Sequence, residues 1–383
     1  MSADGLYLPP ARSGVAWLLD PDHPHLAERV DAALASTADT PVDPDAFSDD
    51  LGVLALLLQE RHFGIATGRV AAGPALAAIH AAAERCRRER RATFGDAWGT
   101  LVDDLRSLTG DRHVQATGAG PSVIRADDPA AAFPAGEPAV QVSSDDGVLW
   151  VRLARLAGSA KDLADLSRFV EEAPAHFRHD RIVVDLRGNT GGDDSFVLAW
   201  AAQGVPEAIN YPETAREWRI GGFVPNAWNW AAIEESRHGP GGLPPELAKH
   251  RHTPGPADVL KVVDVAPAHV PVGPVPWRGR MLVLTDARTG SSGESGAWIL
   301  KHLLGARLAG APGKGCIEYG NIAPYVLPNT GAVVTLATKH NDYGFPVEMQ
   351  GFPVDVELDV TLPAAELVAA WRWDASSVPP SLG

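Results

Sequence analysis

The amino-acid sequence predicts an α/β fold preceded by a helical domain, and three observations lead to this prediction. The 383 residues are 45% hydrophobic, which is enough for a large buried core. From residue 26 to residue 108, apolar residues recur at three- and four-residue spacing, as they do in helices. After residue 130, short apolar runs alternate with helical patterns, which is typical of a largely parallel sheet with right-handed crossovers.

The predicted helical domain covers residues 1–130. Its helical segments are expected at residues 26–36, 51–60, 70–90 and 94–108. The stretch at 118–137 is rich in glycine, proline and alanine, as a linker is.

The predicted α/β core covers residues 131–383. Its strands are expected at 148–153, 181–186 and 281–285, followed by helices at 160–172, 194–202 and 295–304. An insertion at 204–276, which contains Trp218, Trp228 and Trp230, is expected to shape a binding pocket. Further strands at 326–327 and 332–337 and a helix at 363–373 complete the predicted core.

The composition argues against several classes of function. The net charge of −15 repels nucleic acid and anionic membrane surfaces. Cys86 and Cys316 are far apart and form no disulfide framework or cysteine-rich zinc site. The sequence shows no signal peptide and no run of about 18 apolar residues, so we expect a soluble, cytoplasmic protein. Because His250 and His252 have no nearby acidic or cysteine partners, no metal is expected, and no cofactor is expected either. The oligomeric state stays open, a homo-oligomer included.

The core is organised around a serine-rich turn, TGSSGE at residues 289–294, which lies between the strand at 281–285 and the helix at 295–304. The first N–H groups of a helix have no partner within it and carry the positive end of its dipole. A serine hydroxyl there can attack a carbonyl carbon while a neighbouring N–H group stabilises the oxyanion. The alternative is that Ser291 or Ser292 only caps the helix.

A glycine-rich turn, RGNTGGD at residues 187–193, follows the strand at 181–186. Glycine lets the backbone approach a ligand closely and direct its N–H groups toward it. In parallel sheets, ligands bind beyond the carboxyl ends of the strands, where this turn is expected. The alternative is an ordinary tight turn.

Together, DLRGNTGG at 185–192 and TGSSGE at 289–294 resemble peptidase family S41, whose signatures are D-L-R-x-N-x-G-G and T-x-S-x-x-E. This family includes the C-terminal processing proteases, the tricorn core protease and the interphotoreceptor retinoid-binding protein. Weaker similarity is found in LTGDRH at 108–113 and in the segment at 347–355. The resemblance implies a ClpP/crotonase-type core. Since only residues 114–147 separate the helices from the core, no PDZ domain is expected.

The resemblance also implies roles for individual residues. Ser291 is the expected nucleophile, and the N–H of Ser292 is expected to form the oxyanion hole with that of Gly191 or Gly192. Glu294, in the first turn of the helix, is expected to be structural, and so is Thr289.

The general base has two candidates. Tricorn-like members use a histidine and a late glutamate, which correspond to His113 and Glu348 here. Processing proteases use a lysine, and Lys314 is a match shifted along the sequence. We favour His113, because imidazole titrates near neutral pH and a lysine must be desolvated to do so. The tricorn class has a serine where this chain has Arg112. His62 ranks as a third candidate.

The predicted function is a serine hydrolase that cleaves an amide bond of a peptide or peptide-like substrate through an acyl-enzyme at Ser291. Two alternatives remain open. The same site could act on an ester, a lactone or a tailored natural-product intermediate as a hydrolase, cyclase or transferase. The fold could instead hold an apolar ligand without catalysis.

Overall fold

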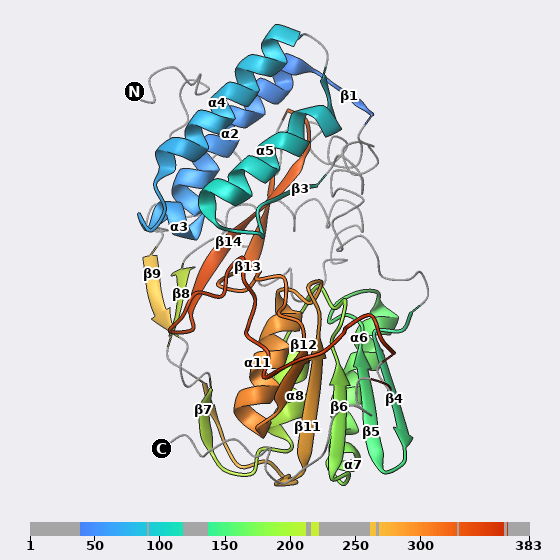
Figure 1. The fold of residues 1–383 in the computed structure, drawn as a ribbon. Helices are drawn as coiled ribbons and strands as arrows, with labels where there is room; N and C mark the ends of the chain where they lie inside the picture. Colours follow the sequence, from blue (N-terminus) through green and yellow to red (C-terminus); the bar gives the residue numbers. More distant parts are fainter. Residues whose placement is uncertain are drawn as a thin grey trace, which may run out of the picture. The chain divides into compact units, whose positions relative to one another are not determined.

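The computed structural model describes residues 39–89, 92–117, 137–211, 216–221, 261–265, 268–327, 329–363 and 366. The chain divides into two compact units, whose elements are labelled in Figure 1. The first unit comprises Met1–Asp128, Trp218–Val265 and Tyr319–His340, and the second comprises Pro129–Glu217, Ala266–Glu318 and Asn341–Gly383.

The helices of the first unit begin where the sequence supplies capping residues. The Asp43 side chain accepts the N–H groups of Asp45 and Ala46 at the start of α2, and Thr93 accepts the N–H of Asp96 in α5. The helices are α2 (Pro44–Arg61), α3 (Phe63–Ala66), α4 (Ala72–Glu89) and α5 (Phe94–Thr109). The helices predicted at 51–60, 70–90 and 94–108 are confirmed. The one predicted at 26–36 lies outside the described residues.

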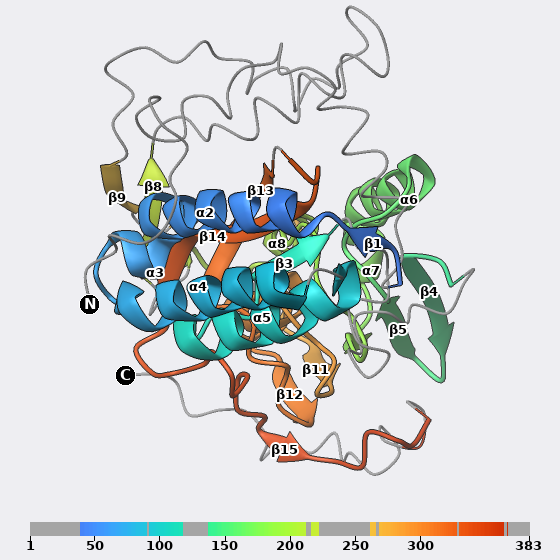
Figure 2. The ribbon, with the colours of Figure 1, turned by 90° about the horizontal axis from the view of Figure 1, so that it is seen from above.

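A sheet completes the first unit, and in Figure 2 helices α2, α4 and α5 lie across its strands β13 and β14. Tyr325 and Leu336 from these strands pack with Phe47 and Trp98 from the helices in one apolar core. The sequence analysis assigns the strands predicted at 326–327 and 332–337 to the core at 131–383. In the structure, the segment Tyr319–His340, which contains them, belongs to the first unit. The strands are β13 (Tyr319–Val326), β14 (Val333–Asp342), β8 (Arg216–Gly221) and β9 (Lys261–Val265), in that order, with β3 (Gln115–Thr117) also paired to β14. Separately, β1 (Pro41–Val42) pairs with β2 (Ala92–Thr93).

In the described part of the second unit, six strands form a mainly parallel sheet. Its order is β15 (Val356–Glu357), β12 (Arg307–Gly310), β11 (Arg280–Thr285), β6 (Arg181–Asp185), β5 (Val148–Leu153) and β4 (Val140–Asp145). Only the β4–β5 pair of this sheet is antiparallel. The predicted α/β class is therefore confirmed. A short antiparallel pair, β7 (Ile209–Tyr211) with β10 (Ala268–Val270), lies outside this sheet.

Both faces of the central strands are buried. Along β6, Ile182 and Val184 join the large core that includes Leu300 of α11, whereas Val183 joins a smaller cluster with Leu282. This alternation follows from the two-residue period of a strand. The helices of this unit are α6 (Ala160–Glu171), α7 (Ala173–His176), α8 (Ser195–Ala202) and α11 (Ser292–Leu304).

The parallel register of β6 and β11 pairs Asp185 with Leu284, so both strands end at the same edge of the sheet. The turns that follow them are thereby brought together. Most of the predicted insertion at 204–276 and of the helix at 363–373 lies outside the described residues. Among the helices that the structure describes, none has the length and apolar character needed to cross a membrane.

Candidate active site

Ser291 lies between β11 and α11 in an unusual backbone conformation. Its φ is 51° and its ψ is −126°, and the helix begins at the next residue. A positive φ is costly for a residue with a Cβ atom and persists only where the surroundings impose it. Such a sharp, strained strand-to-helix turn is typical of nucleophilic serines, because it lifts the hydroxyl away from the backbone. The Ser291 side chain is half-buried.

The glycine-rich turn lies directly against Ser291. Gly191 has a φ of 116°, and a Cβ atom there would lie only 2.8 Å from Ser291 Cβ and 3.2 Å from Ser291 Oγ. Gly290 N–H donates to the Asn189 carbonyl at 2.9 Å, and Ser292 Oγ donates to the Gly192 carbonyl at 2.8 Å. The structure therefore brings together the two motifs that are about a hundred residues apart in sequence.

The backbone N–H groups around Ser291 differ in whether they are already used. Gly191 N–H donates to Asn189 Oδ1 at 2.8 Å, so it is committed to its own turn. The N–H groups of Gly192 and Ser292 donate no hydrogen bond to any residue that the structure describes. Of the two glycines that the sequence left open, Gly192 is thus the better partner for Ser292 in an oxyanion hole.

Asp286 joins the two turns, and the sequence interpretation overlooked it. Its Oδ1 atom accepts the N–H groups of Gly188 at 2.9 Å and of Arg288 and Thr289 at 3.0 Å. Burial alone would raise the pKa of this carboxyl, but the hydrogen bonds from Gly188 and Arg288 outweigh it and hold the pKa below its usual value. Its place directly after an apolar strand is the sequence signal that could have identified it.

Thr289 supports the same junction. Its hydroxyl donates to the Leu186 carbonyl at 3.0 Å, across to the end of β6. Its backbone carbonyl accepts the N–H of Lys314 at 2.6 Å. These contacts are those of a structural residue.

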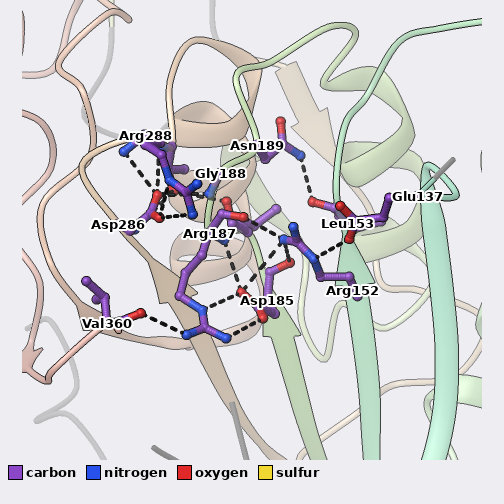
Figure 3. A network of polar contacts seen from close by, with 12 residues as sticks. Glu137, Arg152, Leu153, Asp185, Arg187, Gly188, Asn189, Asp286, Arg288 and Val360 are labelled. Atoms are coloured by element: carbon purple, nitrogen blue, oxygen red, sulfur yellow. Dashed lines mark hydrogen bonds and ion pairs between the residues drawn. The ribbon is translucent and has the colours of Figure 1, made fainter. Parts of the chain in front are cut away.

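Charged side chains form a network of hydrogen bonds and ion pairs at the base of the glycine-rich turn, which Figure 3 shows. Arg187 binds both carboxylate oxygens of Asp185, through Nε at 3.0 Å and Nη2 at 2.8 Å, and this pairing raises the pKa of the guanidinium. Arg187 also donates to the carbonyl of Val360 at 3.1 Å. Arg152 donates to the Arg187 carbonyl at 2.6 Å and to Glu137 at 3.0 Å. The charged residues of the DLR motif therefore hold the turn in shape.

Glu294 is buried and binds the loop that carries Lys314. Its Oε1 atom accepts the N–H of Gly315 at 3.0 Å, and its Oε2 atom accepts the N–H of Cys316 at 2.8 Å. A carboxylate in the first turn of α11 also interacts favourably with the helix dipole. The loop is thereby tied to the helix that begins just after Ser291.

Lys314 lies beside the serine turn. A Cβ atom added to Gly290 would be 3.4 Å from both Cβ and Cδ of Lys314, so the aliphatic part of the lysine side chain covers the residue before Ser291. The structure thus places the second candidate base next to the serine-rich turn.

Glu348 lies in a turn that packs on the Lys314 loop. Its Oε2 atom accepts the N–H groups of Ile317 and Glu318, both at 2.9 Å. Met349 N–H donates to the Gly315 carbonyl at 2.7 Å, and Met349 has a positive φ of 68°. One oxygen of Glu348 therefore has a structural role in the second unit.

His113 belongs to the first unit, just after the end of α5. It is buried, with 6% of its surface exposed, and its backbone N–H donates to Asp111 Oδ1 at 2.7 Å. His62, the third candidate base, also belongs to the first unit. The remaining candidates belong to the second unit and are Ser291, Ser292, Gly191, Gly192, Lys314 and Glu348.

Comparison with protein families matches residues 147–358 to the model of peptidase family S41. Comparison with curated proteins finds no match. Among solved structures, the chain is similar to mature CPAF complexed with lactacystin, at 12% identity and a TM-score of 0.53, over 82% of this chain and 94% of that chain. It is also similar to a lipoprotein from Streptococcus agalactiae, at 11% identity and a TM-score of 0.50, over 84% and 96% of the two chains. At these identities the similarity concerns the fold.

Proposed function

The chain belongs to peptidase family S41, and on this premise we propose that it cleaves an amide bond of a peptide or peptide-like substrate through an acyl-enzyme at Ser291. The observation that carries the proposal is the strained turn at Ser291. This turn brings together the Ser291 hydroxyl and the N–H groups of Gly192 and Ser292, which have no partner among the described residues. Gly191 also approaches Ser291 closely there. A residue that only caps a helix needs neither the strain nor the second turn.

The chemistry follows from this arrangement. Ser291 Oγ attacks the carbonyl carbon, and the carbonyl oxygen takes up the negative charge, which the N–H groups of Gly192 and Ser292 stabilise. Removing one such donor typically slows a reaction about 10²- to 10³-fold. The C–N bond then breaks and leaves the acyl group on Ser291, and a water molecule releases the acid in the second half of the reaction.

The base removes the Ser291 proton during attack and returns it to the leaving amine. We assign this role to His113, because a neutral imidazole can both accept and donate a proton near pH 7. Glu348 would orient the base or bind the amino end of the substrate. Lys314 is the alternative base. The contact of its aliphatic side chain with Gly290, the residue before Ser291, supports this alternative.

The test is labelling by a fluorophosphonate probe from pH 5 to pH 10, with wild type, Ser291→Ala, His113→Ala and Lys314→Ala. We expect wild-type labelling to follow a group that titrates near about 7 and to disappear with Ser291→Ala and His113→Ala. If labelling depends on Lys314 and survives His113→Ala, the base is the lysine. If the wild type is not labelled at any pH, nucleophilic catalysis is rejected and a binding function is favoured.

Labelling identifies the nucleophile but not the bond that is cleaved. The matched substrates are a peptide anilide and the ester with the same acyl group. If the anilide is hydrolysed and Ser291→Ala abolishes this hydrolysis, the proposed peptidase activity is supported. If only the ester is turned over, the result contradicts peptidase activity and favours an ester or lactone as the substrate.

A further inference from the structure

A chain of three buried polar side chains leads to His113 within the first unit. His62 Nε2 lies 3.1 Å from Asp111 Oδ2, and His113 Nδ1 lies 3.5 Å from Asp111 Oδ1. His62 and Asp111 are both 0% exposed. Burying a carboxylate this completely costs free energy unless hydrogen bonds and opposite charge compensate for it. The contacts of Asp111 with the two histidines can supply this compensation.

His62 has a defined tautomer in this chain. Its Nδ1 atom accepts the N–H of Ile65 at 3.2 Å, as the cap of α3, and an atom that accepts a hydrogen bond carries no proton. The proton is therefore on Nε2, which donates it to Asp111. With both ring nitrogens used and no exposed surface, His62 is unsuited to be the base and instead anchors the carboxylate.

Asp111 holds His113 at two places. Its Oδ1 atom accepts the backbone N–H of His113 at 2.7 Å, and the same oxygen lies 3.5 Å from Nδ1 of the ring. The ring contact is longer than a good hydrogen bond, so it acts mainly through charge in this conformation. Catalytic contacts often shorten only when substrate binds. The contact places Nδ1 on the side of the carboxylate, so the proposed proton transfer is assigned to Nε2.

Asp111 is ionised in this setting. Burial alone would raise the pKa of its carboxyl, but the contacts with His113 and His62 outweigh burial and hold the pKa well below its usual value. A second buried carboxylate of the first unit, Asp50, has no histidine partner among the described residues and instead binds Asn329 and Thr330. Its pKa is raised to about 6 by burial. The contacts with the two histidines therefore explain why the pKa of Asp111 is lowered whereas that of Asp50 is raised.

We propose that Asp111 is the positioning residue of the base, holding His113 with Nδ1–H toward the carboxylate, and that His62 fixes Asp111 from behind. The proposal rests on the proposed function, in which His113 is the base. When Ser291 Oγ bonds to the substrate carbon, its proton moves to His113 Nε2. Asp111 stays ionised and stabilises the positive charge on the ring. The proton leaves again with the amine, so Asp111 itself gains and loses none.

The first experiment measures the rate of fluorophosphonate labelling against pH for wild type and Asp111→Asn. We expect the rate at pH 7 to fall about 10²-fold or more, because the amide no longer selects the tautomer or stabilises the imidazolium. We also expect the midpoint of the pH profile to move to lower pH, since losing a negative charge lowers the pKa of His113. Among the described residues of the first unit, the other titratable or charged side chains near this cluster include Tyr319, whose ring contacts that of His62, and His340, whose ring contacts that of Tyr319. They also include Arg106, which donates to the Val114 carbonyl, and Arg112, which lies between Asp111 and His113 in the sequence.

The matched control is Asp50→Asn, which changes an equally buried carboxylate of the same unit. It is expected to alter stability and to leave the midpoint of the labelling profile in place. His62→Gln keeps a donor for Asp111 and is expected to lose less activity than Asp111→Asn. All rates are compared below the unfolding temperature of each variant. A loss shared equally by Asp50→Asn and Asp111→Asn, without a shift of midpoint, would show a merely structural role.

The second experiment reads the tautomer of His113 from its ¹⁵N chemical shifts in the whole protein. We expect Nδ1–H in the wild type and a mixture of tautomers in Asp111→Asn. Unchanged tautomer and unchanged midpoint would overturn the proposal. If labelling needs His113 but not Asp111, only the positioning role fails. If labelling survives His113→Ala, the proposed base fails, and the positioning role is rejected with it.

Discussion

The turn around Ser291 and the cluster around Asp111 restrain the proposed nucleophile and the proposed base by different means. At Ser291, the restraint comes from the backbone, through the positive φ and the close approach of Gly191. Around His113, it comes from buried side chains, with Asp111 between two imidazole rings. The first arrangement is sensitive to the volume of a single methyl group, and the second to charge. Substitutions that change one property at a time can therefore separate them.

The largest effect is expected from Gly191→Ala. Its Cβ atom would meet Ser291 Cβ at 2.8 Å and the N atom of Ser292 at 3.0 Å, at a φ of 116° that alanine rarely adopts. We expect the labelling rate to fall roughly 10²-fold or more, because small displacements at a reacting centre have effects of this size. Gly344→Ala is the control, since Gly344 also has a positive φ but has open space around it. Equal losses in both variants would contradict a role for the close approach.

A change in pH is expected to separate the two buried carboxylates of the first unit. The pKa of Asp50 is raised to about 6 from an ordinary 3.8, so the stability that it contributes is present below pH 3.8 and lost as the pH rises through 6. The loss amounts to about 3 kcal/mol in the free energy of unfolding. The pKa of Asp111 is instead lowered from 3.8, so the stability that Asp111 contributes is present above pH 3.8 and lost as the pH falls below it.

Urea unfolding at pH 4 and at pH 7, for wild type and Asp50→Asn, measures this effect. We expect the wild type to lose more free energy of unfolding between these pH values than the variant does. Asp111→Asn is expected to run almost parallel to the wild type, because both pH values lie above the ordinary pKa of 3.8, below which that of Asp111 is lowered. A profile of Asp50→Asn that is parallel to that of the wild type would show that the pKa of Asp50 is not raised.

A smaller effect is expected from Glu294→Gln. The amide keeps one acceptor for the N–H groups of Gly315 and Cys316 and presents an N–H group to the other, which leaves a buried donor unpaired. We expect a loss of about 2 kcal/mol in the free energy of unfolding. Glu357→Gln, on the exposed side of β15, is the control and is expected to change little. A loss no greater than that of the control would contradict the structural role of Glu294.

The smallest effect is expected from Thr289→Val. Valine has a similar shape but cannot donate to the Leu186 carbonyl, so the link between the two strand ends is lost. We expect a loss of about 1 kcal/mol in the free energy of unfolding, with labelling affected less than in Gly191→Ala. Thr361→Val is the control, because its hydroxyl is exposed. A collapse of labelling in Thr289→Val would show that this hydroxyl takes part in the reaction.

The elements of the fold could be predicted where their signals are local. The strand at 148–153 matches β5, and the helix predicted at 295–304 begins only three residues earlier, at Ser292. Such signals depend on periodicity within a few residues. The packing of Tyr325 and Leu336 against helices near the start of the chain could not be predicted, because it depends on contacts between distant segments.

The candidate site was predictable to a similar degree. The two motifs identified Ser291 and the glycine-rich turn, since each is a short run of residues at a strand end. Asp286 was missed, and Asn189 was identified only as part of the motif, because their contacts across to the other turn join distant segments. His62 was predicted only as a separate candidate base. Its contact with Asp111 could not be predicted, because the two residues are 49 positions apart in the sequence.

The sequence by itself therefore determined the α/β class, the family and the candidate nucleophile, because these are written in short motifs and in periodicity. Only the tertiary structure decided that Gly191 N–H is committed to its own turn whereas Gly192 N–H has no partner in the described part of the chain, and that Glu294 holds the Lys314 loop. Only the tertiary structure, too, placed a buried carboxylate between two histidines. Hydrogen bonds and burial depend on which distant residues meet, and that is settled when the chain folds.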